Sequence, residues 1–493
     1  MVLGLPRSRR RRQRQRPHGD ARTPRPDGRR GPQALRPLRP SRIAGRERRG
    51  KMSGGRDLSI RIEEITRVEG HGDIVMDLES GEITTLELRI VESPRFFEAM
   101  LRGRGYMEAQ HIMSRICGIC AVSHSLASLK AVEAALGMEI SEQARLLRRL
   151  AHCGEMLQSH LLHLCFLVLP DLEGEDSVIP LIEREPGLMK KALRLKALAN
   201  SICEVVAGRH IHPISLQPGG VTHVPSAREL ERLGTELSGS IGELEELAGF
   251  FLGRCAPEFT RPREHISLKS PGGYGFYDGE PFSDRAGPLG VGTYTKHVKE
   301  YVVPYSTALQ AATAGGDYMV GALSRVANGF DSLSAAARKA ASEARLAPTV
   351  QGAPSAWNNP FANNLAQLVE CFHFTDEAVA IIEGLLARGL EDEELARPTR
   401  WGTGVGVVEA PRGLLYHEYA VADGGTVESA RCIIPTAQNL RSMEEDLRAF
   451  APTIAGESEA RIRLAVEALV RAYDPCISCA THLINVEFTG QGA

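Results

Sequence analysis

The chain carries two Cys-x-x-Cys pairs that lie far apart in the sequence. Cys117 and Cys120 form the first pair and Cys476 and Cys479 the second, with 355 residues between the pairs. Four thiolates can complete a tetrahedral site for a metal that prefers sulfur. A zinc ribbon places its pairs only about 15 to 20 residues apart, so a local zinc-stapled hairpin is excluded. If the pairs act together, segments from both ends of the fold must meet in space.

Residue chemistry alone leaves several interpretations of these pairs open. They are two unrelated pairs, a long-range structural zinc site, a thioredoxin-like redox pair, or ligands of a thiolate-bound redox metal. The absence of a βαβ pattern argues against the thioredoxin-like interpretation. The other cysteines occur singly, as is typical of small buried hydrophobic residues: Cys153, Cys165, Cys203, Cys255, Cys371 and Cys432. This usage fits a reducing compartment better than a secreted disulfide framework.

Composition indicates an ordinary globular protein. Hydrophobic residues make up 43% and charged residues 24% of the 493 residues, which excludes collagen-like and wholly disordered classes. The longest apolar stretch, residues 161–169, is far shorter than the roughly 20 residues that cross a bilayer, so we expect no membrane span.

Residues 1–51 differ from the rest, with 17 Arg and one Lys against three acidic residues. We expect this Arg- and Pro-rich extension to be disordered, or to reflect an over-extended translation start, because it lacks the apolar residues that would offset the entropy of ordering. A nucleic-acid-binding arm is a third alternative, but no aromatic residue is interleaved for base stacking, and we expect no nucleic acid. No apolar region follows residues 9–12, so we expect no secretory signal and a cytoplasmic location.

Hydrophobic periodicity predicts one mainly α domain with small antiparallel β elements (α+β) over residues 52–482. Alternation predicts an antiparallel sheet over residues 58–92, and again strands over residues 402–434 with a hairpin at Gly424-Gly425. Helical spacing is found near residues 94–113, 120–136, 141–169, 185–208, 228–253, 296–345, 364–390, 438–450 and 456–472. Gly- and Pro-rich residues 212–225, 256–292 and 346–363 are expected to be long connections. Gly402, Gly404 and Gly406 alternate in Gly-x-Gly-x-Gly, which is not the spacing of a dinucleotide-binding loop.

Four motifs, in order along the chain, resemble those of the large subunit of nickel–iron hydrogenases. They are Arg67-Val68-Glu69-Gly70-His71, the first cysteine pair with His124 downstream, Glu409-Ala410-Pro411-Arg412-Gly413, and Asp474-Pro475-Cys476-Ile477-Ser478-Cys479-Ala480-Thr481-His482. The resemblance covers nearly everything from Met52 to the C-terminus and favours the redox-metal interpretation of the cysteines. The motifs are most similar to those of the cytoplasmic, bidirectional, cofactor-linked branch of the family. It implies the multihelical hydrogenase large-subunit fold and reversible heterolytic cleavage of H2 to protons and electrons.

The resemblance also implies the ligands of a nickel–iron centre. Cys117 and Cys476 correspond to terminal nickel ligands, and Cys120 and Cys479 to ligands that bridge nickel to an iron bearing carbon monoxide and cyanide. The family also holds a magnesium (or iron) ion near the C-terminus. Its ligands correspond to Glu98, the backbone carbonyl of Cys432 and His482.

The family's proton-transfer groups correspond to further residues of this chain. Glu69 matches the glutamate that exchanges a proton with the terminal thiolate of Cys476, and Arg412 matches an arginine above the open metal position. The motifs leave open whether Glu69 or Arg412 is the base. The resemblance places these groups around the cofactor: Pro411 and Asp474 beside Arg412, Thr436 as a donor to a cyanide nitrogen, and His124 as a hydrogen-bond partner of a bridging cysteine.

The resemblance implies partners as well. Electrons would pass to a small subunit with iron–sulfur clusters and then, through diaphorase-type subunits, to NAD(P) or a similar soluble cofactor. Residues 483–493 correspond to a tail that a maturation endopeptidase removes after His482. Two alternatives stay open: a hydrogen-sensing regulatory subunit, which often lacks such a tail, and a non-catalytic scaffold subunit of a respiratory complex, which lacks the paired cysteines.

Overall fold

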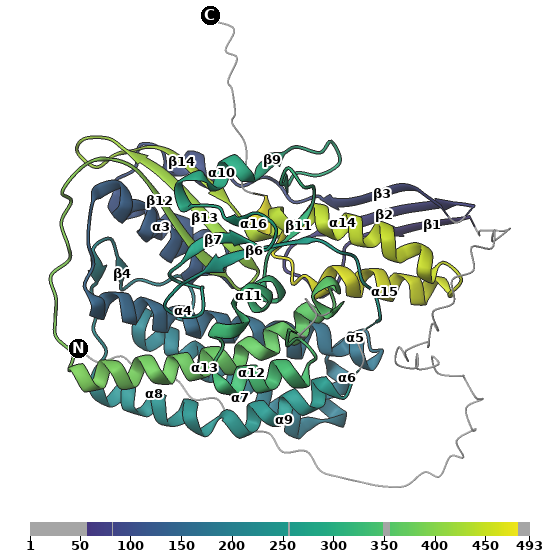
Figure 1. Cartoon of the computed structure of the whole chain (residues 1–493), viewed down its shortest axis with the longest axis horizontal. Helices are drawn as coiled ribbons and strands as arrows, with labels where there is room; N and C mark the ends of the chain where they lie inside the picture. Colours follow the sequence, from purple (N-terminus) through teal and green to yellow (C-terminus); the bar gives the residue numbers. More distant parts are fainter. Residues whose placement is uncertain (1–56, 81, 255–256, 349–354, 482–493) are drawn as a thin grey trace, which may run out of the picture. The chain divides into compact units, whose positions relative to one another are not determined.

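The computed structural model describes residues 57–80, 82–254, 257–348 and 355–481 (Figure 1). These residues all belong to one compact unit of the chain. The predicted N-terminal extension, the predicted maturation tail and His482 lie outside the described residues. Among the helices that are described, none combines the length and the apolar character that a bilayer crossing requires.

The strands of the described residues form several small sheets. Two are three-stranded and antiparallel: β1 (Leu58–Ile62), β2 (Gly72–Glu79) and β3 (Glu82–Ile90), and β12 (Gly402–Ala410), β13 (Gly413–Val421) and β14 (Val427–Ile433). A mixed sheet has the order β11 (Tyr318–Met319), β6 (Glu264–Lys269), β7 (Glu280–Ser283) and β8 (Gly287–Pro288). Two short pairs complete the set: β4 (Leu216–Gln217) with β5 (Gly220–Val221), and β9 (Lys299–Tyr301) with β10 (Gln310–Ala312).

Helices make up most of the structure. They are α1 (Phe97–Leu101), α2 (Tyr106–Met113), α3 (Ala121–Leu136), α4 (Glu142–Leu162), α5 (Leu169–Glu173), α6 (Ile179–Arg184), α7 (Pro186–Ala207), α8 (Ala227–Gly239), α9 (Ile241–Leu252), α10 (Tyr294–His297), α11 (Ala322–Gly329), α12 (Ala335–Glu343), α13 (Ala362–Arg388), α14 (Pro435–Ile454), α15 (Glu459–Ala472) and α16 (Ile477–Ala480). A π-helix, His163–Val168, continues α4, and a 3-10 helix spans Ser114–Ile116.

A layer of long helices lies beside the sheets (Figure 1). Within it α4 packs against α7 and α13, and α13 also packs against α8 and α12. Serine side chains begin two of these helices, because Ser141 accepts the backbone N–H of Ala144 and Ser226 forms a capping box with Glu229. The helical layer gives α4 and α13 fixed positions, and both helices carry polar side chains that hydrogen-bond to the segments beside the cysteines.

Small residues bring α3 unusually close to strand β12. A Cβ atom at Gly404 would overlap backbone atoms of Ala131 and Ala135, and a Cβ at Gly406 would overlap the carbonyl oxygen of Ala127. The alternating glycines are therefore a contact surface for a helix. This contact joins the helix that begins beside Cys120 to the sheet whose β12–β13 turn carries the Arg412 motif.

Most of the predicted elements are confirmed. The fold is mainly helical with small antiparallel sheets, and the sheet over residues 58–92 and the strands over 402–434 are present. The prediction of helix throughout residues 296–345 is wrong in its first half, where β9, β10 and β11 occur. Residues 308–314 are Ala-rich and therefore helix-favouring, but Pro304 and Gly315-Gly316 bound them and pairing with β9 makes them extended. The connection predicted over residues 256–292 contains β6, β7 and β8.

The contact between β12 and α3 makes Gly406 sensitive to a single added carbon. We expect Gly406→Ala to lower the free energy of unfolding by about 1–3 kcal/mol, because the backbone of β12 must move away from α3. Thermal unfolding of the purified protein measures this loss. Gly242→Ala is the matched control, since Gly242 is exposed in α9 with open space around it and the change should be neutral or slightly stabilising. Equal midpoints for both variants would contradict the tight contact.

Candidate metal centre

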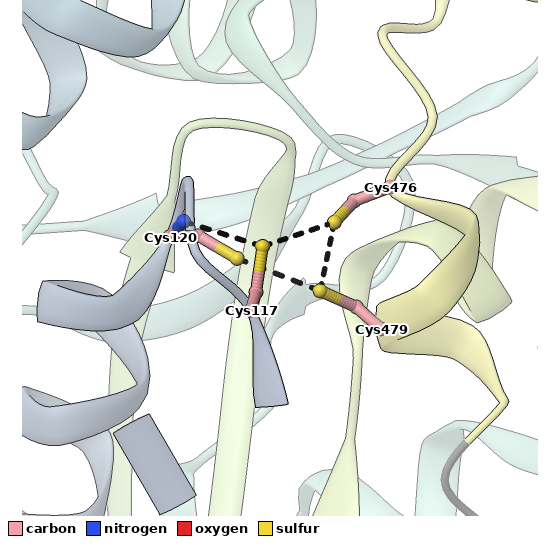
Figure 2. Close-up of side chains that lie close together, drawn as sticks. All are labelled: Cys117, Cys120, Cys476 and Cys479. Atoms are coloured by element: carbon pink, nitrogen blue, oxygen red, sulfur yellow. Dashed lines mark hydrogen bonds between the residues drawn. The ribbon is translucent and has the colours of Figure 1, made fainter. Parts of the chain in front are cut away.

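Four cysteine side chains from the two ends of the described chain point toward one another (Figure 2). Cys117 follows the 3-10 helix Ser114–Ile116 and Cys120 precedes α3, while Cys476 precedes α16 and Cys479 lies within it. All four are buried, and their Sγ atoms lie within 4.8 Å of one another. The Sγ–Sγ distances are 2.8 Å for Cys476–Cys479, 3.3 Å for Cys117–Cys476 and 3.6 Å for Cys120–Cys479. The predicted meeting of the two cysteine pairs is confirmed.

The thiols are too crowded to ionise together without a cation. Hydrogen bonds from Cys120 and Cys476 hold the pKa of Cys117 well below its usual range. In turn, the hydrogen bond with Cys117, together with burial, raises the pKa of Cys120 to about 11, and burial raises the pKa values of Cys476 and Cys479 well above their usual range. A bound metal ion removes this conflict because it stabilises every thiolate. The donor set therefore fits soft, thiolate-binding metals such as nickel and iron.

The two ends of the site are joined through the backbone. The N–H of Ile477 donates to the carbonyl oxygen of Glu69 at 2.9 Å, in an isolated bridge between Glu69 and Cys476. Gly70 has φ +85°, and a Cβ there would lie 2.8 Å from both Ile477 and the Ser478 nitrogen. Arg95 adds a second link, because its N–H donates to the Thr481 carbonyl. The glycine in the first motif thus allows the C-terminal segment to approach.

The Glu69 carboxylate contacts the cysteine cluster directly. Its Oε2 lies 3.1 Å from the Cys476 Sγ and 3.1 Å from the Ser478 backbone nitrogen, which donates to it. The Ser478 hydroxyl donates to Oε1. A carboxylate held by two donors and in contact with a thiol is placed to exchange a proton with that sulfur.

Arg412 lies buried beside the cluster in the β12–β13 turn. Its Nε donates to the Asp474 carbonyl oxygen and its Nη2 to the Asp474 carboxylate, both at 2.8 Å, and its Nη1 donates to Ser159 Oγ at 3.2 Å. Burial opposes its charge, but Asp474 and the neighbouring thiols, Cys476 first, raise its pKa well above the usual range. Arg412 is therefore a permanent cation facing the thiols.

A second buried arginine holds the turn that carries Arg412. The Arg325 guanidinium on α11 donates to the carbonyl oxygens of Ala410 and Pro411, each at 3.0 Å. It also donates to Glu409 at 3.0 Å and twice to Glu370 at 2.6 Å, so all five of its N–H groups are used. The Arg325, Glu370 and Glu409 side chains are fully buried. This network fixes the main chain immediately before Arg412.

Helix α4 holds the first cysteine pair in the same way. Glu155 accepts the backbone N–H groups of Val122 at 2.6 Å and Ser123 at 2.8 Å, at the start of α3. Gln158 donates to the Ile119 carbonyl at 2.8 Å, inside the Cys-x-x-Cys loop. Burial raises the pKa of Glu155 to about 8, although these donors lower it. Gln158 thus fixes the loop between Cys117 and Cys120, and Glu155 fixes the helix start that follows it.

The structure places the other predicted residues as follows. His124 is buried on α3 with Nδ1 3.3 Å from His417 Nε2, and the Thr436 hydroxyl accepts the Cys476 backbone N–H at 2.9 Å. Pro411 precedes Arg412 in the turn, and Asp474 pairs with Arg412. Glu98 Oε1 accepts the Cys432 backbone N–H at 2.7 Å, so two members of the predicted magnesium site meet, while His482 lies outside the described residues. Burial raises the pKa of Glu98 to about 7.

Several residues of the site were not predicted. Ser159, Arg325 and Glu155 lie in helical stretches, outside every motif, and they contact residues beside the cluster only because of tertiary packing. Asp171 is another, because it pairs with both Arg67 of the first motif and Arg471 near the last one. In the sequence, such a supporting residue is recognisable only as an acid or arginine at a buried position of a helix. Many residues of this kind are purely structural.

Comparison with known proteins identifies the family. The family model described as nickel-dependent hydrogenase matches residues 95–172 and 292–482, and a model described as HoxL-like matches residues 59–93. The alpha subunit of sulfhydrogenase 2 from Pyrococcus furiosus is 36% identical over 430 residues, which cover 87% of this chain and 100% of that protein. The beta subunit of the NAD-reducing hydrogenase HoxS from Cupriavidus necator is 29% identical, over 86% of this chain and 94% of that protein.

The solved structures agree. The crystal structure of an NAD+-reducing [NiFe]-hydrogenase in the H2-reduced state matches with a TM-score of 0.78 and 29% identity, over 86% of this chain and 99% of that one. The chain belongs to the nickel-dependent hydrogenase family, and it is the large subunit of a heteromeric nickel–iron hydrogenase, an oxidoreductase that acts on hydrogen. The cysteine cluster fits the metal site of that family.

Replacing one sulfur should prevent metal binding. We expect Cys479→Ser to reduce the nickel content of the purified complex to background, because a hydroxyl is a poor ligand for a soft metal. Elemental analysis measures nickel per chain. Cys203→Ser serves as the control, since Cys203 is equally buried but outside the cluster. A Cys479→Ser complex with normal nickel content would refute the ligand assignment.

Proposed function

We propose that Cys117, Cys120, Cys476 and Cys479 hold nickel and iron, and that Glu69 moves protons to and from the Cys476 sulfur during hydrogen cleavage. One observation carries the proton role: the Glu69 Oε2 lies 3.1 Å from the Cys476 Sγ. When bound, the metal pair supplies the Lewis-acid and redox chemistry that polarises hydrogen and accepts its electrons.

The chain's own residues would then supply orientation and proton transfer. The buried walls around the thiols keep bulk water away, which strengthens the field of nearby charges. Arg412 presents a fixed positive charge to the thiols, with Asp474 and Ser159 setting its orientation. Glu69 is only partly buried, so it could carry protons between the cluster and the surface. We assign Glu69 as the proton carrier and Arg412 as the orienting cation.

The assignment of Glu69 predicts a separation of metal binding from proton transfer. We expect Glu69→Gln to keep its nickel but to lose hydrogen–deuterium exchange by about 100-fold or more, because an amide of nearly the same shape can still accept one hydrogen bond from Ser478 but cannot take up a proton. Exchange is followed by mass spectrometry of the gas phase. Glu63→Gln, an exposed change nearby, should exchange normally. Normal exchange in Glu69→Gln would remove Glu69 from the proton path.

A second ion is proposed near the C-terminal segment. Glu98 and the Cys432 carbonyl, with His482, would bind magnesium (or iron). The partly buried Glu98 carboxyl has its pKa raised to about 7 by burial, so a cation beside it would offset the cost of its charge. This site would hold the C-terminal segment against strand β14.

The electron route is proposed from the relatives. One relative is named an NAD-reducing hydrogenase and another a sulfhydrogenase, and both names denote subunits of larger enzymes. Within the described residues, the cysteine cluster is the one detected group of three or more metal-ligating side chains. We propose that electrons pass to an iron–sulfur small subunit and then through diaphorase-type subunits to NAD(P), in the cytoplasm. Residues 1–51 would be an N-terminal extension outside the hydrogenase domain, 52–482 the large-subunit domain, and 483–493 a peptide removed by a maturation endopeptidase.

Purification of the complex from its host tests these partner proposals together. We expect an iron–sulfur subunit to copurify, hydrogen to reduce NAD+ or NADP+, and the intact mass of the large chain to correspond to an end at His482. Reduction of artificial dyes but of neither nucleotide would contradict the proposed acceptor. A large chain that retains residues 483–493 in an active complex would contradict the maturation proposal.

A further inference from the structure

Arg412 is held by two separate sets of contacts, one on its side chain and one on its main chain. The guanidinium contacts Asp474 and Ser159, and the Asp474 carboxylate also accepts the side-chain N–H of Gln367 at 2.9 Å. The main chain of the β12–β13 turn lies instead against α11, the helix that carries Arg325. The side-chain contacts set the direction of the guanidinium, whereas the main-chain contacts set the point from which it extends.

The residues that lead into α11 pack directly against the turn. Gly413 has φ +133°, and a Cβ there would lie 2.8 Å from the backbone nitrogen of Gly321. A Cβ at Gly321, which has φ +123°, would lie 3.2 Å from the Arg412 carbonyl oxygen. Val320 is fixed as well, because the Asn439 side chain accepts its N–H at 2.9 Å and donates to its carbonyl oxygen at 3.1 Å. The two glycines therefore let the turn and the start of the helix approach each other.

Arg325 extends from the first turn of α11 back to the β12–β13 turn. Its backbone N–H donates to the Gly321 carbonyl oxygen at 2.9 Å, and its guanidinium donates to the carbonyl oxygens of Ala410 and Pro411. Proline has no N–H, so its carbonyl oxygen is the one main-chain group through which Pro411 can be held by a hydrogen bond. Arg325 supplies that hydrogen bond to the residue immediately before Arg412.

The two acids that bind this guanidinium are themselves held. Glu370 accepts the Tyr274 hydroxyl at 2.7 Å through one oxygen, and its other oxygen lies 2.8 Å from His160 Nε2. Glu409 accepts the Leu268 backbone N–H at 2.7 Å. Because the acids are buried, the guanidinium cannot turn or shift without breaking charge-assisted hydrogen bonds at a place where water does not replace them.

We propose that Arg325 is a positioning residue for hydrogen cleavage, because it holds the turn from which the Arg412 guanidinium extends toward the cysteines. The proposal rests on the function proposed above, in which Arg412 is the orienting cation. Arg325 contacts the turn and two acids, and it is assigned no contact with hydrogen, metal or thiol. Its role depends on geometry and not on a change of protonation.

A displaced turn would draw the Arg412 guanidinium away from its place beside the thiols. Asp474 and Ser159 belong to other segments of the chain and would not move with the turn. A displacement of about 1 Å can lower the rate of a catalysed reaction about 100-fold, because the reacting groups must meet in one orientation. Lysine cannot replace Arg325, because an ammonium carries three donors on a single atom and cannot reach two acids and two carbonyl oxygens together.

The experiment compares conservative changes of two buried arginines in the purified hydrogenase complex, Arg325→Lys and Arg148→Lys. Arg148 is the matched control, because it is also fully buried and binds the same kinds of partner: both oxygens of Glu133 and the carbonyl oxygens of Gln217 and Gly220. These partners lie on α3 and in the β4–β5 pair, outside the motifs around the cysteines. Nickel per chain, gas-phase hydrogen–deuterium exchange and the exchange of backbone amides in the β12–β13 turn are measured.

Normal nickel content is expected in both variants, because the cysteines are unchanged. Arg325→Lys should lower gas-phase exchange by about 10- to 100-fold, because the Arg412 guanidinium is misplaced. It should also speed the exchange of backbone amides in the turn, a readout that does not depend on the metals. Arg148→Lys should leave both quantities close to their wild-type values.

A double-mutant cycle shows whether Arg325 acts through Arg412. If it does, Arg325→Lys should add less than about a twofold further loss of gas-phase exchange in an Arg412→Gln background, since the group that it positions is already absent. The cycle is also read from the infrared bands of the iron's carbon monoxide and cyanide, which require the metals but not turnover. Arg325→Lys should shift these bands when Arg412 is present and leave them unchanged in the Arg412→Gln background.

Other outcomes overturn the proposal. Equal losses in Arg325→Lys and Arg148→Lys would show a general effect of weakened packing, and losses that multiply in the double variant would show that Arg325 acts independently of Arg412. If Arg325→Lys does not fold, Glu370→Gln takes its place, because it keeps Arg325 but sets an amide N–H against the guanidinium; unchanged exchange in that variant would overturn the proposal. Absence of nickel from the wild-type complex would contradict the proposed function instead, while amide exchange would still decide whether Arg325 holds the turn.

Discussion

The structure depends on a buried cluster of four thiols. These thiols can all be ionised at once only if a cation is bound among them. Their sulfur atoms approach to within 4.8 Å, and burial or a neighbouring sulfur raises the pKa of three of the four. Such a cluster is costly for a fold without metal and favourable for one with it. The rest of the molecule explains how thiols from distant parts of the chain reach one another: Gly70 admits the C-terminal segment, and Gly404 and Gly406 admit α3.

Beside the cluster, the Arg325 charge is fixed by being fully hydrogen-bonded. Arg325 uses every N–H group on Glu370, Glu409 and two carbonyl oxygens, and thereby holds the turn before Arg412. Buried ion pairs of this kind contribute little net stability, because their desolvation offsets their attraction. Here these interactions fix geometry. The Ala410 and Pro411 carbonyls cannot shift without breaking their hydrogen bonds to Arg325, which is itself held by Glu370 and Glu409. The site is therefore preorganised by charges one layer away from the thiols.

The sequence predicts the candidate metal ligands, but it does not predict the residues that hold them in place. Cys117, Cys120, Cys476, Cys479, Glu69 and Arg412 lie in short motifs whose residue types state their chemistry, and the structure brings these residues together. Ser159, Gln367 and Arg325 lie in helices whose periodicity reports only which face is buried. Their hydrogen-bond partners are set by tertiary packing, which cannot be deduced from a single sequence. The same limit explains residues 296–345, where strand pairing overrides the helical propensity of an Ala-rich stretch.

X-ray absorption at the nickel edge of the wild-type complex, combined with its elemental analysis, would show whether the four cysteines hold nickel. We expect about one nickel per large chain with a first coordination shell dominated by sulfur, as the four cysteines require. Zinc in place of nickel, or nickel surrounded by nitrogen and oxygen, would contradict it.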